Sequence, residues 1–243
     1  RLVERAYIRR QLMIAADSIK GLAIQEDITA LEAVARAETH ILNITTEQKD
    51  IRDISFGAHI SAYFDDLERL MNNPEELLGI PTGFKELDTL LSGLQRTDLL
   101  IFAARPGMGK TAWLVNVALH AARMKQRVGF ITLEMGTKQI IQRMVSTETG
   151  INLQTLRTGK ITNGEWKKFV DATERIHSLP IFIDDTSALT PHQIRQRVMR
   201  WKHQHGLDLL IVDYLQKMGS GGGYDPKARV QEVSYFARSL KDM

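Results

Sequence analysis

The stretch DLLIFAARPGMGKT, residues 98–111, decides the fold class of this chain. Its apolar run at 98–104 predicts a short strand, and a helical pattern follows over 111–124. Gly109, Lys110 and Thr111 match the end of the phosphate-binding loop G-x-x-x-x-G-K-[ST], although Ala104 stands where its first glycine would be. The match predicts the strand–loop–helix unit of a P-loop NTPase, within an α/β protein.

The loop chemistry follows from its residue types. Backbone N–H groups at the start of a helix attract phosphate, and Gly107 and Gly109 let the backbone approach it closely. Lys110 is expected to reach the β- and γ-phosphates, and Thr111 to place its hydroxyl on Mg²⁺. The predicted nucleotide site comprises Arg105, Pro106, Gly107, Met108, Gly109, Lys110, Thr111 and Ala112. A chance GKT in a strand-to-helix turn is the alternative, which the surrounding strand, glycines and helix disfavour.

Further strands and helices alternate along the chain. Apolar runs predict strands at 127–134, 180–185 and 207–214. Helices are predicted at 137–148, at 162–177 behind a Thr162–Glu165 capping box, and from Thr190-Pro191 onward. Near-continuous apolar strands are typical of a parallel sheet covered by helices on both faces.

Acidic residues close two of these strands. Asp213 ends one strand and Glu134 another, at the carboxyl edge where ligands of such sheets bind. We interpret Asp213 as a Mg²⁺ ligand and Glu134 as the base that polarises the attacking water. The alternatives are a solvated strand-end acid for Asp213 and a helix-start carboxylate for Glu134. Asp184 and Asp185 precede Thr186-Ser187, so turn formation explains them better than metal binding.

The region before the predicted NTPase domain is helical. Residues 1–46 predict two helices, the second opened by Thr29 and Glu32 as a capping box. Residues 47–78 predict a linker that carries one amphipathic helix. Its apolar stripe comprises Phe56, Ile60, Tyr63, Phe64, Leu67, Leu70 and Met71. That stripe could pack on its own chain or on a neighbouring subunit, and the pattern alone favours neither.

Composition excludes several classes of protein. Hydrophobic residues make up 43% and charged residues 25% of the 243 residues, as in ordinary globular proteins. A net charge of +3 is too small to indicate nucleic-acid binding by itself. The chain has no cysteine, which excludes disulfides and thiolate metal sites, and no run of membrane-spanning length.

These motifs together resemble a known family. Residues 79–111, GIPTGFKELDTLLSGLQRTDLLIFAARPGMGKT, look like the start of the RecA-like ATPase domain of DnaB-type replicative DNA helicases. ITLEM, LRTGKIT, IDD and VDYLQKM then follow in the order and spacing of that family, and QEVSYFARSLK resembles its next helix. Residues 1–46 are similar to the helical hairpin of its N-terminal domain, and 56–73 to its linker helix. Alanine at position 104 is normal in this family.

The resemblance implies a RecA-like P-loop NTPase over 79–243, incomplete at its C-terminal end, in a chain truncated at both ends. It implies that Lys110 and Glu134 are catalytic, and that Thr111 and Asp213 hold Mg²⁺ beside ATP. The family forms ring hexamers that move 5′ to 3′ on single-stranded DNA, with the linker helix on the adjacent subunit. Primase and a helicase loader are the implied partners, and the cytoplasm, at a bacterial or phage replisome, is the implied location.

Two other functions compete with a replicative helicase. One is a different RecA-fold ATPase, of the recombinase or clock type, which the N-terminal helices disfavour. The other is an assembly module whose nucleotide site controls ring contacts without turnover. The family's γ-phosphate sensor, DNA-contacting loops and arginine finger are expected outside this sequence.

Overall fold

The computed structural model describes residues 2–25, 28–30, 32–34, 36–37, 40–41, 56–72, 77–218 and 229–243. The chain forms two compact units, Arg1–Asp65 and Asp66–Met243, which are described separately. The elements are, in chain order, α1 (Leu2–Ile24), α3 (Phe56–Asn72), α4 (Lys85–Leu91), α5 (Lys110–Arg123), β1 (Val128–Thr132), α6 (Thr137–Thr149), α7 (Leu153–Thr158), α8 (Asn163–His177), β2 (Ile181–Asp184), α9 (Pro191–Gln204), β3 (Leu209–Asp213), the 3₁₀ helix η1 (Leu215–Lys217) and α10 (Arg229–Lys241).

The first unit contains the long helix α1. Beyond it, the Thr29 N–H donates to a carboxylate oxygen of Glu32 at 3.1 Å, and the Glu32 N–H donates to the Thr29 hydroxyl at 3.3 Å. The predicted capping box is therefore present. The predicted linker 47–55 lies outside the described residues, and the domain boundaries at 46/47 and 78/79 remain predictions. No helix in the described part of the chain is both long and apolar enough to cross a membrane.

The second unit is built on a parallel sheet with the strand order β2-β1-β3. Val128 of β1 pairs with Ile181 on one side and Leu209 on the other, so the three strands begin in register. Helices α6, α7 and α8 connect β1 to β2, and α9 connects β2 to β3. The predicted strands at 127–134, 180–185 and 207–214 are confirmed, each slightly shorter than expected.

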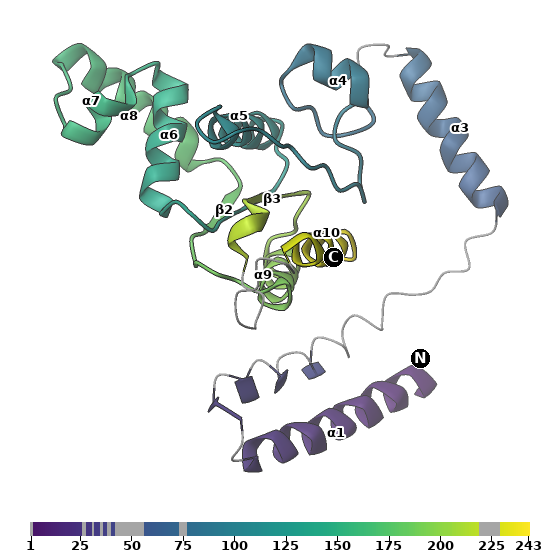
Figure 1. The fold of residues 1–243 in the computed structure, drawn as a ribbon. Helices are drawn as coiled ribbons and strands as arrows, with labels where there is room; N and C mark the ends of the chain where they lie inside the picture. Colours follow the sequence, from purple (N-terminus) through teal and green to yellow (C-terminus); the bar gives the residue numbers. More distant parts are fainter. Residues whose placement is uncertain are drawn as a thin grey trace. The chain divides into compact units, whose positions relative to one another are not determined.

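Successive side chains of a strand point to opposite faces of the sheet, so its apolar residues belong to two separate hydrophobic cores. Val128 and Phe130 of β1 pack with α5 and α6, whereas Ile131 packs with α9 and α10. Figure 1 shows α5 and α6 on one side of the sheet and α9 and α10 on the other. Helices thus cover both faces of the sheet, which confirms the predicted α/β class and explains why the strands are apolar on both faces.

The strand predicted at 98–104 is wrong. Residues 98–105 have no strand structure and form no backbone ladder with β3. Leu100, Ile101 and Phe102 are 51%, 60% and 48% exposed, and the Phe102 ring stacks on Trp113 of α5 with centroids 4.2 Å apart. An apolar run favours a strand but does not supply a hydrogen-bonding partner, so without a ladder to β3 the segment is an irregular, largely exposed connection.

Helix caps fix the elements on either side of β2. The Thr162 hydroxyl accepts from the Glu165 N–H and the Glu165 carboxylate accepts from the Thr162 N–H, at the start of α8. Thr190 caps α9 in the same way with Gln193, and Pro191 occupies its first turn. Both predicted helix starts are therefore confirmed, because these side chains satisfy N–H groups that a helix leaves free.

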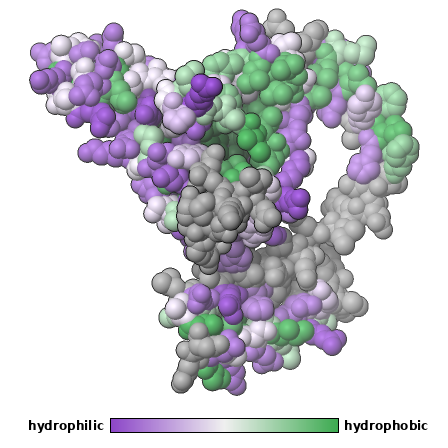
Figure 2. Space-filling model, in the orientation of Figure 1, coloured by the Kyte–Doolittle hydropathy of each residue, from purple (hydrophilic) through white to green (hydrophobic). Residues whose placement is uncertain are grey.

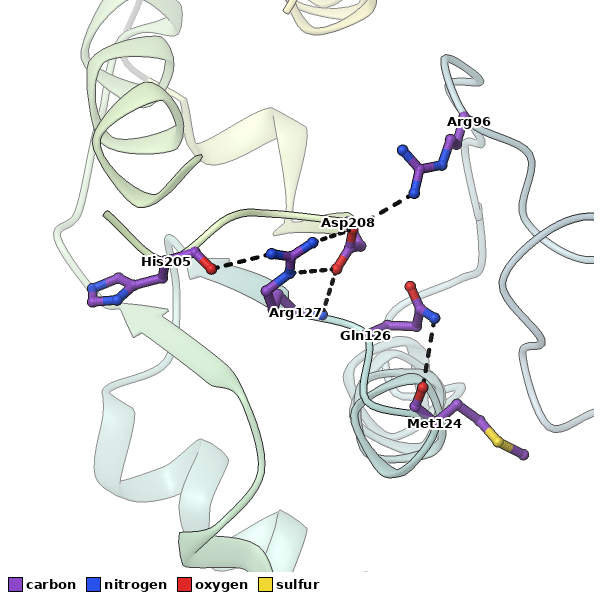
Figure 3. Close-up of polar contacts among 6 residues, drawn as sticks. All are labelled: Arg96, Met124, Gln126, Arg127, His205 and Asp208. Carbon is purple, nitrogen blue, oxygen red and sulfur yellow. Dashed lines mark hydrogen bonds and ion pairs between the residues drawn. The ribbon is translucent and has the colours of Figure 1, made fainter. Parts of the chain in front are cut away.

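An ion pair closes the amino edge of the sheet, opposite the strand ends that carry Asp213 and Glu134. The Arg127 guanidinium donates from Nε to Asp208 Oδ2 at 2.7 Å and from Nη2 to Oδ1 at 3.0 Å (Figure 3). Arg96 lies farther away, with Nη2 at 3.8 Å from Asp208 Oδ1. The hydrogen bond from Arg127 lowers the pKa of Asp208. This two-pronged contact joins the residues that precede β1 and β3.

The segment before the loop is held together by contacts within residues 80–94, and its Ile80 packs against the core beside α5 and α6. Thr82 is fully buried, and its N–H and hydroxyl donate to Asp88 Oδ1 at 2.7 and 2.6 Å. Ile80 pairs with Leu94 across an antiparallel bridge that brackets α4.

Figure 2 shows hydrophobic side chains gathered where Figure 1 draws α4, and also along α3.

Candidate nucleotide-binding site

The predicted phosphate loop precedes α5, whose inner face is anchored in the core. Val115, Ala118 and Leu119 are buried against the sheet. Residues 105–109 are exposed, and Gly107 and Gly109 adopt φ angles of +79° and +89°. A side chain at either position would be strained, and its absence leaves the backbone N–H groups of the loop accessible. The free N–H groups and dipole at the start of α5 favour an anion there.

One hydrogen bond joins the loop helix to the end of β3. The Thr111 hydroxyl, in the first turn of α5, donates to Asp213 Oδ2 at 2.7 Å. Asp213 is the last residue of β3 and is 3% exposed. The two residues predicted to hold Mg²⁺ are therefore in direct contact, although 102 positions separate them in the chain.

The carboxyl group of Asp213 is electrostatically perturbed. Burial raises its pKa above the ordinary value for aspartate, and the nearby negative charge of Glu134 raises it further. The Thr111 hydrogen bond and the positive charges of Lys110 and Arg143 act in the opposite direction without cancelling the shift. A buried carboxylate with a raised pKa lacks full charge compensation within the protein, which is a property of sites that receive a cation.

Glu134 lies beside Asp213 because β1 and β3 are neighbours. Thr132 pairs with Asp213, and the Leu133 N–H donates to the Asp213 carbonyl at 2.7 Å. The buried Thr132 hydroxyl then closes the turn, because it donates to the Met135 carbonyl at 2.8 Å and accepts from the Met135 N–H at 3.1 Å. This turn leaves the Glu134 side chain exposed at the carboxyl edge of the sheet.

Lys110, at the first position of α5, is placed over an aromatic ring. Its ammonium nitrogen lies 4.9 Å from the ring centroid of Tyr214, the residue that follows Asp213. Within the described residues, Lys110 forms no ion pair, since no carboxylate oxygen comes within 4.0 Å of its nitrogen. The candidate site therefore gathers Lys110, Thr111, Glu134 and Asp213 around the strand ends.

The donor set suits Mg²⁺. This cation prefers oxygen ligands, and P-loop sites supply few of them from protein because substrate phosphates and waters complete the shell. Thr111 and Asp213 offer a hydroxyl and a carboxylate in contact, and the carboxylate is incompletely compensated. No group of three or more His, Cys, Asp or Glu residues suited to a metal occurs in the described part of the chain.

Asp184 forms the predicted turn, whereas Asp185 bonds to the start of α6 instead. Asp184 Oδ1 accepts from the Thr186 N–H at 2.9 Å, and its other oxygen pairs with Arg197 of α9. Asp185 Oδ2 accepts from the Thr137 N–H at 2.8 Å, at the start of α6. Both carboxyl groups therefore have structural partners.

Sequence reasoning missed two side chains of this site. Tyr214 was visible only as part of VDYLQKM, and no spacing rule connects it to Lys110. Arg143 of α6 is the second, because its charge acts on Asp213 while its buried Nε has no hydrogen-bond partner. An unpaired buried N–H is rare in folded proteins, and its position beside the site is the only signal that identifies it.

Known proteins carry the same architecture. Residues 79–243 match the family model described as the DnaB-like helicase C-terminal domain. The chain is 38% identical over 249 residues to the replicative DNA helicase DnaB of Geobacillus stearothermophilus, covering 99% of this chain and 53% of the relative. It is 35% identical to the replicative DNA helicase DnaC of Bacillus subtilis (strain 168), covering 100% and 54% of the two chains. The chain thus spans about half the length of these curated relatives.

Solved structures support the same fold. A DnaB-like replicative helicase, described with its interactions with primase, aligns with a TM-score of 0.75 and 24% identity over 99% of this chain and 55% of the other. A second solved structure, described as an ATPase domain, aligns with a TM-score of 0.68 and 28% identity over 77% and 67% of the two chains. The fold is therefore that of a RecA-like ATPase domain, and the chain belongs to the family of DnaB-like helicase C-terminal domains.

Proposed function

We propose that this chain provides the ATP site of a replicative DNA helicase that moves 5′ to 3′ on single-stranded DNA and unwinds the duplex at the fork. The observation that carries the proposal is the contact of Thr111 with Asp213, beside Glu134 and at the start of α5. Membership of the DnaB-like family supports helicase action over the other RecA-fold activities.

Each residue of the site has a proposed role. Backbone N–H groups within residues 105–112, all except Pro106, which has none, bind the phosphates, and Lys110 contacts the β- and γ-phosphate oxygens. Thr111 and Asp213 hold Mg²⁺, which neutralises charge on the phosphates when bound. Glu134 orients a water molecule and takes its proton as the water oxygen bonds to the γ-phosphorus, while the bond to the β-phosphate oxygen breaks and ADP leaves.

We also propose that the site works between subunits of a ring, as a hexamer. Residues 105–109 are exposed, which suits completion of the site by a neighbouring chain that supplies an arginine. Phe56, Tyr63 and Phe64 of α3 are 79%, 64% and 64% exposed, which suits a helix that docks on an adjacent subunit. Single-stranded DNA, primase and a helicase loader are the proposed partners, and a bacterial or phage replisome in the cytoplasm is the proposed location.

The complete natural protein that carries this chain tests the proposal. We expect it to unwind a fork with a 5′ single-stranded tail and not one with only a 3′ tail, and to hydrolyse ATP faster with single-stranded DNA. Glu134→Gln should keep ATP binding and lower hydrolysis by about 10²–10⁴-fold, since proton transfer is lost. Glu165→Gln is the matched control, because glutamine preserves the capping box of α8.

The outcomes separate the competing functions. Strand exchange without unwinding would indicate a recombinase, and nucleotide-dependent assembly without turnover would indicate an assembly module. Normal hydrolysis by Glu134→Gln would overturn the assignment of the base.

A further inference from the structure

The contact between Lys110 and Tyr214 has the geometry of a cation–π interaction. The ammonium nitrogen is 4.9 Å from the ring centroid, within the distance of about 6 Å at which an aromatic face attracts a cation. Both side chains are half-buried, so the attraction is less weakened by water than at an open surface.

The backbone fixes the Tyr214 ring together with the carboxylate of the site. Tyr214 follows Asp213 and precedes η1, and its carbonyl accepts from the Lys217 N–H at 3.1 Å. Leu215 and the buried Met218 pack into the core formed with α9 and α10. The ring is therefore held by the same strand end that holds Asp213 against Thr111.

A ring is well suited to hold this particular lysine. Asp213, the acidic group on which the Lys110 charge acts, is already bonded to Thr111, and Lys110 forms no ion pair among the described residues. A carboxylate partner would neutralise the ammonium and compete with phosphate for it. The π face attracts the cation without a net charge and leaves its N–H groups free to donate to phosphate oxygens.

We propose that Tyr214 is a positioning residue, whose ring holds the Lys110 ammonium at the phosphate loop before and during ATP binding. The proposal rests on the proposed function, since it assumes that Lys110 contacts the phosphates of ATP. Its energetic basis is preorganisation: a flexible lysine that is already held in place loses less conformational freedom when the phosphate arrives.

A double-mutant cycle in the complete natural protein tests this role. The measured quantity is the Kd of N-methylanthraniloyl-ATP with Mg²⁺, for the unchanged protein and for Lys110→Ala, Tyr214→Leu, Tyr214→Phe and Lys110→Ala with Tyr214→Leu. We expect Tyr214→Leu to weaken binding by about 2- to 30-fold, which is the range of a partly desolvated cation–π contact. Tyr214→Phe keeps the ring and should stay within about twofold.

The cycle separates positioning from a general structural role. With Lys110 already replaced by alanine, Tyr214→Leu should weaken binding no further, because the ring then has no cation to hold. An equal loss in both backgrounds, or no loss from Tyr214→Leu alone, would overturn the positioning role. If Lys110→Ala itself left binding unchanged, the proposed phosphate contact would fail instead. Should Tyr214→Leu not fold, Tyr214→Met removes the ring at similar volume and completes the same cycle.

Discussion

The Thr111 hydroxyl donates a hydrogen bond of 2.7 Å to Asp213 Oδ2, and this bond joins the first turn of α5 to the end of β3. Both groups are predicted oxygen ligands of Mg²⁺, so the loop and the sheet contribute one ligand each. The bond orders the two ligands relative to one another within the protein. Their geometry therefore depends on the packing of α5 against β1 and β3 rather than on either motif separately.

The first prediction concerns the Thr111 hydroxyl. Thr111→Val keeps the shape of the side chain but removes the donor to Asp213 and the ligand oxygen. Hydrolysis of Mg²⁺-ATP should fall on the order of 10²–10³-fold, as when one charge-stabilising group is lost from an active site. Thr111→Ser is the matched control, because serine keeps the hydroxyl, and its kcat should stay within about tenfold. Equal rates for the two variants would contradict the assignment.

The second prediction concerns the charge of Asp213. Burial raises the pKa of this carboxyl group in the folded protein. The free energy of unfolding therefore falls as pH rises from the unfolded-state pKa to the folded-state pKa, and above the folded-state pKa the ionised carboxylate destabilises the fold. Asp213→Asn should therefore raise the Tm at pH 7, by about 2–4 °C for each kcal/mol of stability gained by a domain of this size. The same variant should lose Mg²⁺-dependent hydrolysis. Thermal melting at pH 7 measures the shift, and a lower Tm would show that the charged form stabilises the fold.

Much of this architecture could be predicted from sequence because its signals are local. The Thr162–Glu165 capping box and the Thr190-Pro191 pair place two helix starts to within a residue, since both signals lie within a few positions of the helix start. The three strands are recognisable because the sheet packs against a hydrophobic core on each face, which favours apolar side chains throughout. Glu134 and Asp213 follow from the strand ends, since parallel strands bring their carboxyl ends to one edge, and Thr111 follows from the phosphate-loop motif.

The errors arise where structure depends on distant partners. Residues 98–104 have the composition of a strand, but strand structure requires a ladder that composition cannot supply, and Phe102 stacks on Trp113 instead. The contact of Lys110 with Tyr214 depends on how α5 packs beside β3, which no spacing within either motif reveals. Local patterns thus predict elements and strand ends, whereas pairwise contacts between elements need the packed structure.

The third prediction concerns the ion pair at the amino edge of the sheet. Asp208→Asn removes the charge that accepts two hydrogen bonds from the Arg127 side chain, and should lower the Tm at pH 7 by about 2–4 °C. Arg127 lowers the pKa of Asp208 in the folded protein, so the stabilisation is present above the ordinary aspartate pKa of about 3.9. It is lost as pH falls through the lowered folded pKa, and the Tm difference between the two proteins should vanish there.

Arg96 provides the control for this cluster. Its side chain is 86% exposed, and the distance from its Nη2 to Asp208 Oδ1 is 3.8 Å, too long for a hydrogen bond. Arg96→Ala should therefore change the Tm by less than about 1 °C. A Tm difference for Asp208→Asn that persists below the folded pKa would show that the carboxylate charge is not its cause.

The last prediction concerns Gly129, the second residue of β1. A Cβ atom there would lie 2.8 Å from Trp201 Cζ3 and 3.1 Å from Leu207 Cδ1, so an alanine would push α9 away from the sheet. Gly129→Ala should lower the free energy of unfolding by about 1–3 kcal/mol through overpacking. Gly164 of α8 is the matched control, because a Cβ there meets nothing within 4 Å, and alanine should stabilise by about 0.4–1 kcal/mol. Urea unfolding measures both changes. A Gly129→Ala variant as stable as the unchanged protein would mean that the Trp201 ring does not pack against Gly129.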